Sequence, residues 1–310
     1  MFKKLYNLSS KRNVSQQLAK HHWHLTHVQR QQQTYDPPAF ETETGTCKSD
    51  LDGIPELHHV LPGSPNHTIN LMKFLSDHRA QGDPAIKACI FLASDYDVRL
   101  TRVCRFQEDF VRKLKDHLLS RLYQYEYNGD ERQFTDTERS YIHFVNNLNR
   151  VIVPKVFRVN YTSYDVHRHQ DFMRPGHGCA VMTLSREDDP NTHVFWYAQV
   201  IRAFLIPLVH AAPDARNHSQ QLMEVLWVRW LGVQPDYQWG FKEARLPKVG
   251  FVPDSDDNAF GFLDPSLVIR SCHLIPVFSE GRTDSLLRHG ESLTRLPGET
   301  DDWSTFYVNM

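Results

Sequence analysis

A series of short runs rich in Val, Ile, Tyr, Trp and Phe fills the sequence after residue 130, and it limits the fold more than any other feature. Turn-forming sequences such as Asn-Asn, Pro-Gly, Asp-Asp-Pro and Pro-Asp separate the runs. Short β-branched and aromatic runs between turn signals predict an all-β unit. The predicted strands cover residues 141–145, 151–161, 179–184, 193–209, 221–231, 248–252 and 272–278. The run at 193–209 is long for a straight strand, so we expect it to bend near Arg202 or to end at Pro207.

Helical periodicity precedes these strands. From residue 99 to residue 125, apolar side chains recur every three or four positions, which predicts one long helix with a single buried stripe. The stripe consists of Val103, Phe106, Phe110, Leu114, Leu118 and Leu122. Start and stop signals at Ser64-Pro65 and at Gly82-Asp83-Pro84 predict an earlier helix between them, and a short helix is expected over 84–93. The fold class is therefore α+β, with an N-terminal helical segment followed by a small β-barrel.

Composition divides the chain into four parts. Residues 1–62 are polar and rich in Gln, His, Thr and Pro. Such a segment buries too little apolar surface to offset the entropy of ordering it, so we expect it to be disordered or weakly helical. A helical subdomain at 63–130, a β module at 131–280 and an extended polar tail at 281–310 follow.

Charge and cysteine content narrow the class of protein. The net charge is −2, so any contact with nucleic acid has to come from a local basic patch. The five cysteines lie far apart and form no Cys-x-x-Cys pair, which favours free thiols in a reducing compartment. The first 30 residues lack the apolar core of a signal peptide, and no apolar stretch is long enough for a membrane span. We therefore expect an intracellular protein that does not contact a membrane.

An acidic stretch, "GFVPDSDDNAFGFLDPSLVIRSCHLIPVF", raises the question of a metal site. Asp254, Asp256 and Asn258 occupy the first, third and fifth positions of an EF-hand calcium loop. That loop needs Gly at its sixth position and Glu at its twelfth, where this chain has Ala259 and Pro265. The stretch is therefore predicted to be a solvated acidic turn.

The remainder of the same stretch is predicted to be structural. Asp264 followed by proline is typical of a helix cap, so a short helix is expected over residues 265–271, followed by a strand. Apolar residues on either side of the cap are expected to anchor the barrel. These residues are Phe260, Phe262, Ile269, Leu274 and Val277.

Other potential metal or catalytic residues are incomplete. His167, His169 and Asp171 alternate in "HRHQD" and would share one face of a strand, but a further ligand for an iron site is not evident. Asp188-Asp189 and the acids at 254–257 fall in predicted loops next to proline rather than inside a buried strand. Histidines 21, 24 and 27 have helical spacing within a polar segment. We therefore predict no catalytic residue, no cofactor and no metal.

The aromatic runs "FWYAQVI" and "EVLWVRWLG" supply the candidate binding residues. They place Trp196, Tyr197, Trp227 and Trp230 on neighbouring predicted strands. Two or three aromatic rings that converge at an exposed opening can hold a methylated lysine. The alternative is that these rings fill the core of a small barrel.

A basic face gives the second set of candidates. Between residues 99 and 121 the predicted helix carries seven Lys or Arg and three acids. The candidate nucleic-acid-binding residues are Lys113, Lys115, Arg121, Arg158 and Arg168. The alternative is an ordinary solvated helix face.

Several long segments resemble a known family. They are "KVFRVNYTSYDVHRHQD", "FWYAQVIRAF", "EVLWVRWLG", "GFVPDSDDNAFGFLDPSLVIRSCHLIPVFSEGRTD", "DWSTFYVNM", "LKDHLLSRL" and "FTDTERSYIHFVNN". They resemble the C-terminal region of basidiomycete transposon-encoded proteins of the Plavaka and Kyakuja-Dileera-Zisupton kind, over roughly residues 56–310. "HRHQD" departs from that family's Arg-rich "RRxQD" stretch. An RNase H-like transposase core would lie upstream in such proteins, so we expect an isolated tail or a degenerate copy.

The order of predicted strands also resembles that of a bromo-adjacent homology (BAH) domain. The resemblance implies an SH3-like, BAH-like β-barrel with a short helix before its last strand, and a nuclear protein that reads chromatin without catalysis. Three functions therefore compete. The first is a transposon-derived, non-enzymatic module that binds chromatin, a histone tail or another protein. The second is a nucleic-acid-binding accessory domain of a transposase that contacts DNA, and the third is a metal-dependent enzyme.

Overall fold

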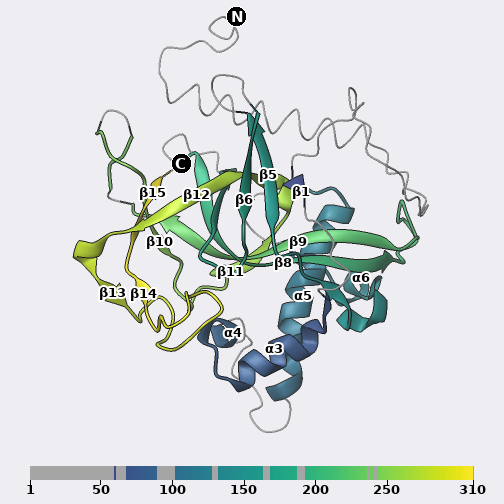
Figure 1. Cartoon of the computed structure of the whole chain (residues 1–310). Helices are drawn as coiled ribbons and strands as arrows, with labels where there is room; N and C mark the ends of the chain where they lie inside the picture. Colours follow the sequence, from purple (N-terminus) through teal and green to yellow (C-terminus); the bar gives the residue numbers. More distant parts are fainter. Residues whose placement is uncertain are drawn as a thin grey trace, which may run out of the picture.

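A computed structural model describes residues 59–60, 68–88, 102–127, 132–162, 168–186, 193–235, 237–240 and 243–309 (Figure 1). The expectation of disorder for residues 1–62 falls almost wholly outside these ranges, as do the three N-terminal histidines. None of the helices in the described ranges is long and apolar enough to cross a membrane.

Antiparallel strands make up most of the described chain. The helices are α3 (Leu71–Ala80), α4 (Pro84–Ala88), α5 (Arg102–Leu122) and α6 (Asp136–Ser140). The strands are β1 (His59–Val60), β2 (Thr68–Ile69), β3 (Ile142–Phe144), β4 (Val151–Ile152), β5 (Phe157–Thr162), β6 (Arg168–Met173), β7 (Ala180–Leu184), β8 (Phe195–His210), β9 (Gln221–Val233), β10 (Lys248–Phe251), β11 (Phe260–Leu263), β12 (Val268–Pro276), β13 (Arg282–Thr283), β14 (Asp302–Trp303) and β15 (Phe306–Asn309). Single 3₁₀ turns are η1 (Val145–Leu148), η2 (Pro265–Leu267) and η3 (Phe278–Glu280). This content confirms the mixed α and β character expected from the sequence.

Strands β8 and β9 form the centre of the largest sheet. They pair antiparallel from Tyr197 opposite Leu231 to Leu208 opposite Gln221. Their register shifts between Val200 and Arg202, at the position where the strand was expected to bend. The alternative, an end at Pro207, is wrong. Pro207 stays in register with β9, and the strand continues to His210.

The pairings also form a closed path. From β9 they lead through β10, β15, β12, β7 and β8 and then return to β9. A buried cluster collects side chains from all six strands, among them Met182, Tyr197, Leu231, Phe251 and Phe306. Because side chains alternate between the two faces of each strand, the side chains of this cluster lie on one face of the closed path.

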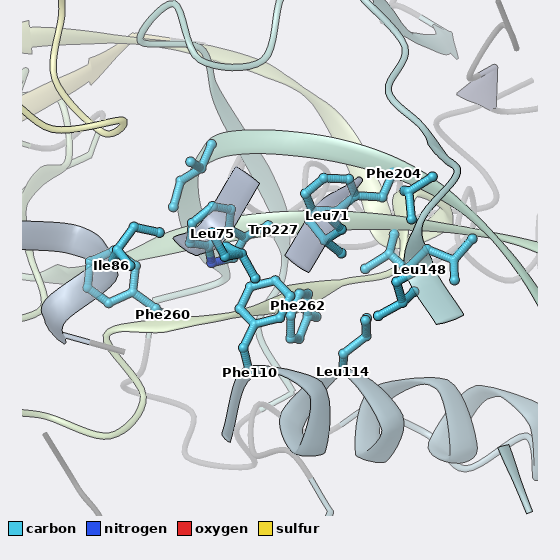
Figure 2. Close-up of a cluster of buried hydrophobic side chains, with 14 of the residues drawn as sticks. Leu71, Leu75, Ile86, Phe110, Leu114, Leu148, Phe204, Trp227, Phe260 and Phe262 are labelled. Carbon is cyan, nitrogen blue, oxygen red and sulfur yellow. The ribbon is translucent and has the colours of Figure 1, made fainter. Parts of the chain in front are cut away.

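The parts of β8 and β9 that extend past the closed path are covered on both faces. Helices α3 and α5 lie on one side, and the hairpin of β5 and β6 stands on the other (Figure 1). Figure 2 shows Phe110 and Leu114 of α5 pointing toward Trp227 and Phe262. The Phe110 ring meets the Trp227 ring edge to face at 5.5 Å and the Phe262 ring at 5.1 Å. The expected helical subdomain and β module therefore share one hydrophobic core.

The long helix is confirmed and the preceding one is corrected. Phe110, Leu114 and Leu118 are buried, as the stripe predicts, and Leu122 packs against the same core. The start signal at Ser64-Pro65 is wrong, because β2 pairs with β4 before the helix begins. The helix begins after Asn70, whose side chain accepts a hydrogen bond from the Lys73 backbone N–H.

The acidic stretch is a turn, as predicted. Asp256 and Asp257 are exposed, and the Asp256 carboxylate accepts a hydrogen bond from the Asn258 backbone N–H. Phe260 and Phe262 are buried on β11.

The helix expected at 265–271 is wrong beyond its first turn. Asp264 caps the single turn η2 by accepting from the Ser266 backbone N–H at 2.9 Å. The chain then enters β12 at Val268, which pairs with β7. Ile269 therefore lies on a strand rather than on a helix. Val277 is buried, whereas Ile269 and Leu274 are half-buried.

The expectation of an extended polar tail at 281–310 also requires correction. Strand β15 fills the position between β10 and β12, and its Phe306 and Val308 are buried. Ahead of it, the buried Asp302 pairs with two buried arginines, Arg229 of β9 and Arg295. The polar composition of this segment gave no sign of its burial, because charged side chains make many of the buried contacts.

Candidate functional site

Three half-buried rings meet beside β8 and β9. Trp196 of β8, Trp230 of β9 and Tyr127, which follows α5, make up the group we call the aromatic cluster. The Tyr127 ring lies 6.2 Å from the Trp196 ring at an interplanar angle of 87°. It stacks on the Trp230 ring at 6.4 Å and 17°. Tyr127 is therefore the central ring of the three.

Strand geometry explains why the two tryptophans come together. Ala198 pairs directly with Trp230, so both side chains point to the same face, and Trp196 is two residues earlier on that face. The small Ala198 leaves room between the indoles. On the other side of Trp230, Gly261 of β11 carries no Cβ, and a Cβ there would lie 3.0 Å from the indole Nε1.

The chemistry of the aromatic cluster suits a cation. Aromatic faces attract ammonium groups through the ring quadrupole, and the attraction increases as the site is desolvated. Glu126, next to Tyr127 in sequence, is exposed and makes an ion pair with Arg186. The chain thus places a carboxylate directly before Tyr127, one of two mutually perpendicular rings.

The other two predicted aromatic residues belong to the interior. Tyr197 is fully buried in the core of the closed path, where burial raises the pKa of its hydroxyl. Trp227 is buried against Phe110 of α5. The expected group of four is therefore split, because neighbouring positions on a strand point to opposite faces. Tyr127 was missed, since it follows the last residue of the helical stripe and belongs to no strand pattern.

Three of the five predicted basic residues are engaged within the chain. The Lys113 ammonium donates to the Asp257 carbonyl at 2.8 Å, and the Lys115 ammonium donates to the Arg139 carbonyl at 2.9 Å. Arg121 makes an ion pair with Asp264 at 2.8 Å. Burial, assisted by the charge of Arg139, lowers the pKa of Lys115. These side chains attach α5 to α6 and to the loops on either side of β11.

The remaining two basic residues lie on the hairpin of β5 and β6, across the sheet from α5. The Arg158 guanidinium lies 5.2 Å from the centre of the Phe172 ring, and Phe172 is 64% exposed. Arg168 begins β6, and its side chain is not among those described. The structure thus places the five basic residues on two separate surfaces.

The potential metal ligands do not converge in the part of the chain that the structure describes. Asp171 accepts a hydrogen bond from the Ser271 backbone N–H at 2.9 Å, and His169 stacks on Tyr161. No group of three His, Cys, Asp or Glu side chains that could hold a metal occurs among the described residues. His167, Asp188 and Asp189 lie outside those residues.

Both cysteines with described side chains are free thiols. Cys179 is half-buried and Cys272 is buried. Burial raises the pKa of each thiol to about 12. A thiol with so high a pKa is a poor nucleophile at neutral pH.

Comparisons of the chain with protein-family models, with curated proteins and with solved structures found no match. The choice among functions therefore depends on the geometry of the aromatic cluster and of the charged groups around the sheet.

Proposed function

We propose that the chain is a non-enzymatic interaction module that binds a cationic side chain of a protein partner at the aromatic cluster. A methylated lysine, as in a histone tail, has the matching chemistry, because methylation removes hydrogen-bond donors and retains the charge. The observation that carries the proposal is the perpendicular arrangement of Tyr127 and Trp196, with Trp230 stacked behind Tyr127.

The arrangement of strands supports the same proposal. A closed path of six antiparallel pairings around one core is what an SH3-like or BAH-like barrel would produce. The single turn η2 ahead of β12 is in keeping with the short helix of that resemblance. Together with the similarity to fungal transposon-encoded proteins, these features favour a transposon-derived, chromatin-reading role in the nucleus.

Peptide binding tests the proposal. Histone-tail peptides with unmodified, monomethyl, dimethyl and trimethyl lysine are titrated into the whole chain by calorimetry. We expect tighter binding as methylation increases, and Tyr127→Ala or Trp196→Ala should weaken it by about tenfold or more. Trp303→Ala is the matched control. Trp303 lies on β14, which pairs with β13, and its ring contacts Phe278 rather than the aromatic cluster. Equal binding of all peptides, or equal loss in the control, would contradict the proposal.

A nucleic-acid-binding role remains the second candidate, and one observation favours it. Phe172 and Arg158 stand side by side on the exposed face of the β5–β6 hairpin, and an exposed ring beside a guanidinium can stack on an unpaired base. Binding of a single-stranded oligonucleotide that weakens with salt and is lost in Phe172→Ala would select this function. No observation among the described residues favours the third candidate, a metal-dependent enzyme.

A further inference from the structure

His210, the last residue of β8, lies where the large sheet meets a small hydrophobic cluster. Its backbone pairs with Ile142 of β3, and the Ala211 backbone N–H donates to the Tyr141 carbonyl just before that strand. The buried members of the small cluster are Leu119, Phe134 and Ile142. Because Leu119 belongs to α5, this junction attaches both β3 and the C-terminal end of α5 to the end of β8.

The imidazole ring of His210 is enclosed at this junction, and the residue is only 3% exposed. The ring of Tyr123, which directly follows α5, meets the imidazole edge to face at 5.5 Å. The Nε2 atom of His210 is buried and has no hydrogen-bond partner among the described residues. An aromatic face accepts a hydrogen bond only weakly, so the Tyr123 ring does not replace an oxygen acceptor.

The lack of a partner for Nε2 is most costly when the imidazole is protonated. In the neutral ring only one of the two nitrogens carries a proton, so Nε2 can remain without one. In the imidazolium ion both nitrogens carry protons, and Nε2 would then be a buried, charged donor that has no acceptor. Burying such a donor costs free energy. The folded junction therefore accommodates neutral His210 and opposes its protonation.

The titratable groups around His210 act in both directions. Burial is the largest factor and lowers the pKa of His210, whereas Asp214, in the loop after β8, raises it and His218 of the same loop lowers it. On the side of α5, burial raises the pKa of the Tyr123 hydroxyl, which therefore stays uncharged at neutral and acidic pH. The other groups that raise the pKa of Tyr123 are Asp214, Glu138, Tyr125 and Tyr141. The one nearby carboxylate that favours protonated His210 is thus outweighed by burial.

We propose that His210 is an acid-sensitive switch, which keeps β3 and the C-terminal end of α5 attached to β8 while it is neutral and releases them when it is protonated. In the released form the imidazolium ion reaches water, so acid favours release. An exposed histidine has a pKa of about 6.5. The stabilisation from neutral His210 is therefore complete above that pH, and it is lost as the pH falls from there toward the lower pKa of the folded state. This switch does not depend on the proposed function.

The first experiment measures amide hydrogen exchange of the whole chain by mass spectrometry at about pH 7.5 and about pH 5, on either side of the pKa of an exposed histidine. Exchange rates are corrected for the intrinsic effect of pH on amides. We expect protection of residues 119–125 and 141–144 to fall by about threefold or more at the lower pH, and that of β12 and β15 by less than about twofold. His210→Phe, which keeps a ring and cannot be protonated, should remove the difference. His143→Gln is the matched control, because His143 is exposed on the same strand β3, and it should respond as the wild type does.

A second variant and a second measurement guard against a misfolded His210→Phe protein. His210→Gln carries an uncharged amide of smaller size and should also remove the acid response. The imidazole of His210 is titrated by NMR in the wild type, and we expect its midpoint below that of an exposed histidine. An acid response that persists in both variants, or that His143→Gln also removes, would overturn the proposal. Loss of protection that is equal in β12, β15 and β3 would overturn it as well, since it would indicate unfolding of the whole chain, and so would an NMR midpoint at or above that of an exposed histidine.

Discussion

At the scale of single residues, the sequence does not show which partners its charged side chains have. Lys113, Lys115 and Arg121 were selected as a basic face because helical spacing puts them on one helix. In the structure these side chains bind two backbone carbonyls and one carboxylate, which belong to α6 and to the loops on either side of β11. Spacing along one element cannot reveal such partners, because they come from elsewhere in the fold.

Cys179 and Cys272 should resist alkylation in the folded protein. With a pKa of about 12, the thiolate is rare at pH 8, and iodoacetamide reacts with the thiolate. Mass spectrometry of the two peptides should show slow labelling that accelerates in urea. The raised pKa values also predict lower stability at high pH. The unfolded thiols ionise from about pH 9, so the stability present below that pH should decline as the pH rises toward 12. Rapid labelling of either thiol in the native state would contradict this expectation.

At the scale of helices and strands, sequence periodicity predicted the buried faces correctly. It failed where pairing with a distant strand determines the secondary structure. The stripe on α5 from Phe110 onward and the two phenylalanines of β11 were predicted correctly, because helical spacing and alternation directly indicate a buried face. The stretch from Val268 to Ser271 was predicted to be helical because Asp264 caps its start. In the structure it forms backbone hydrogen bonds with β7 instead, so the helix ends after one turn. Trp196 and Trp230 of the candidate site were identified from the sequence. Tyr127 could not be, because its contact with these rings depends on how α5 packs against the sheet.

The α5 stripe gives a direct test of that helix. Leu118→Asp would place an unpaired carboxylate in a fully buried position and should cost several kcal/mol, about 3 or more. Lys113→Glu should cost much less, since its ammonium makes one exposed hydrogen bond to the Asp257 carbonyl. Urea denaturation of the two variants gives the comparison. Similar losses in both would mean that the stripe does not face the core.

Asp264 should be more important than its role as a cap suggests. Besides accepting from the Ser266 backbone N–H, it pairs with Arg121 and so joins α5 to the start of β12. Asp264→Ala removes a cap and leaves Arg121 without this partner, so we expect a loss of about 2–4 kcal/mol. Asp256→Asn, in the exposed turn, should be within about 0.5 kcal/mol of the wild type. Denaturation midpoints that agree between the two variants would contradict the role given to Asp264.

At the scale of the whole molecule, the last thirty residues complete the structure. Without β15, strands β10 and β12 would lose the neighbour that joins them, and the closed path of pairings would open. The segment before β15 is held by Asp302, whose oxygens pair with Arg229 at 2.8 Å and Arg295 at 3.0 Å. Arg295 in turn donates to the carbonyls of Leu287, Arg288 and Gly290. One carboxylate therefore connects the central strand β9 with the loop that carries the chain to its final strand.

Asp302→Ala should consequently loosen the whole C-terminal segment rather than one contact. The change leaves two buried guanidinium groups without their carboxylate, and breaking a buried ion pair in this way costs about 3–5 kcal/mol. We expect a sharply lower melting temperature and, in limited proteolysis, early cleavage between residues 281 and 305. Asp301→Ala is the control, because its partner His289 is largely exposed and the pair contributes little. The triple change of Asp302, Arg229 and Arg295 to Leu, Met and Met should recover part of the loss, since apolar side chains of similar length need no counter-ion. If the Asp302→Ala segment stayed as resistant to protease as that of Asp301→Ala, the triad would not be what holds the last strand in place.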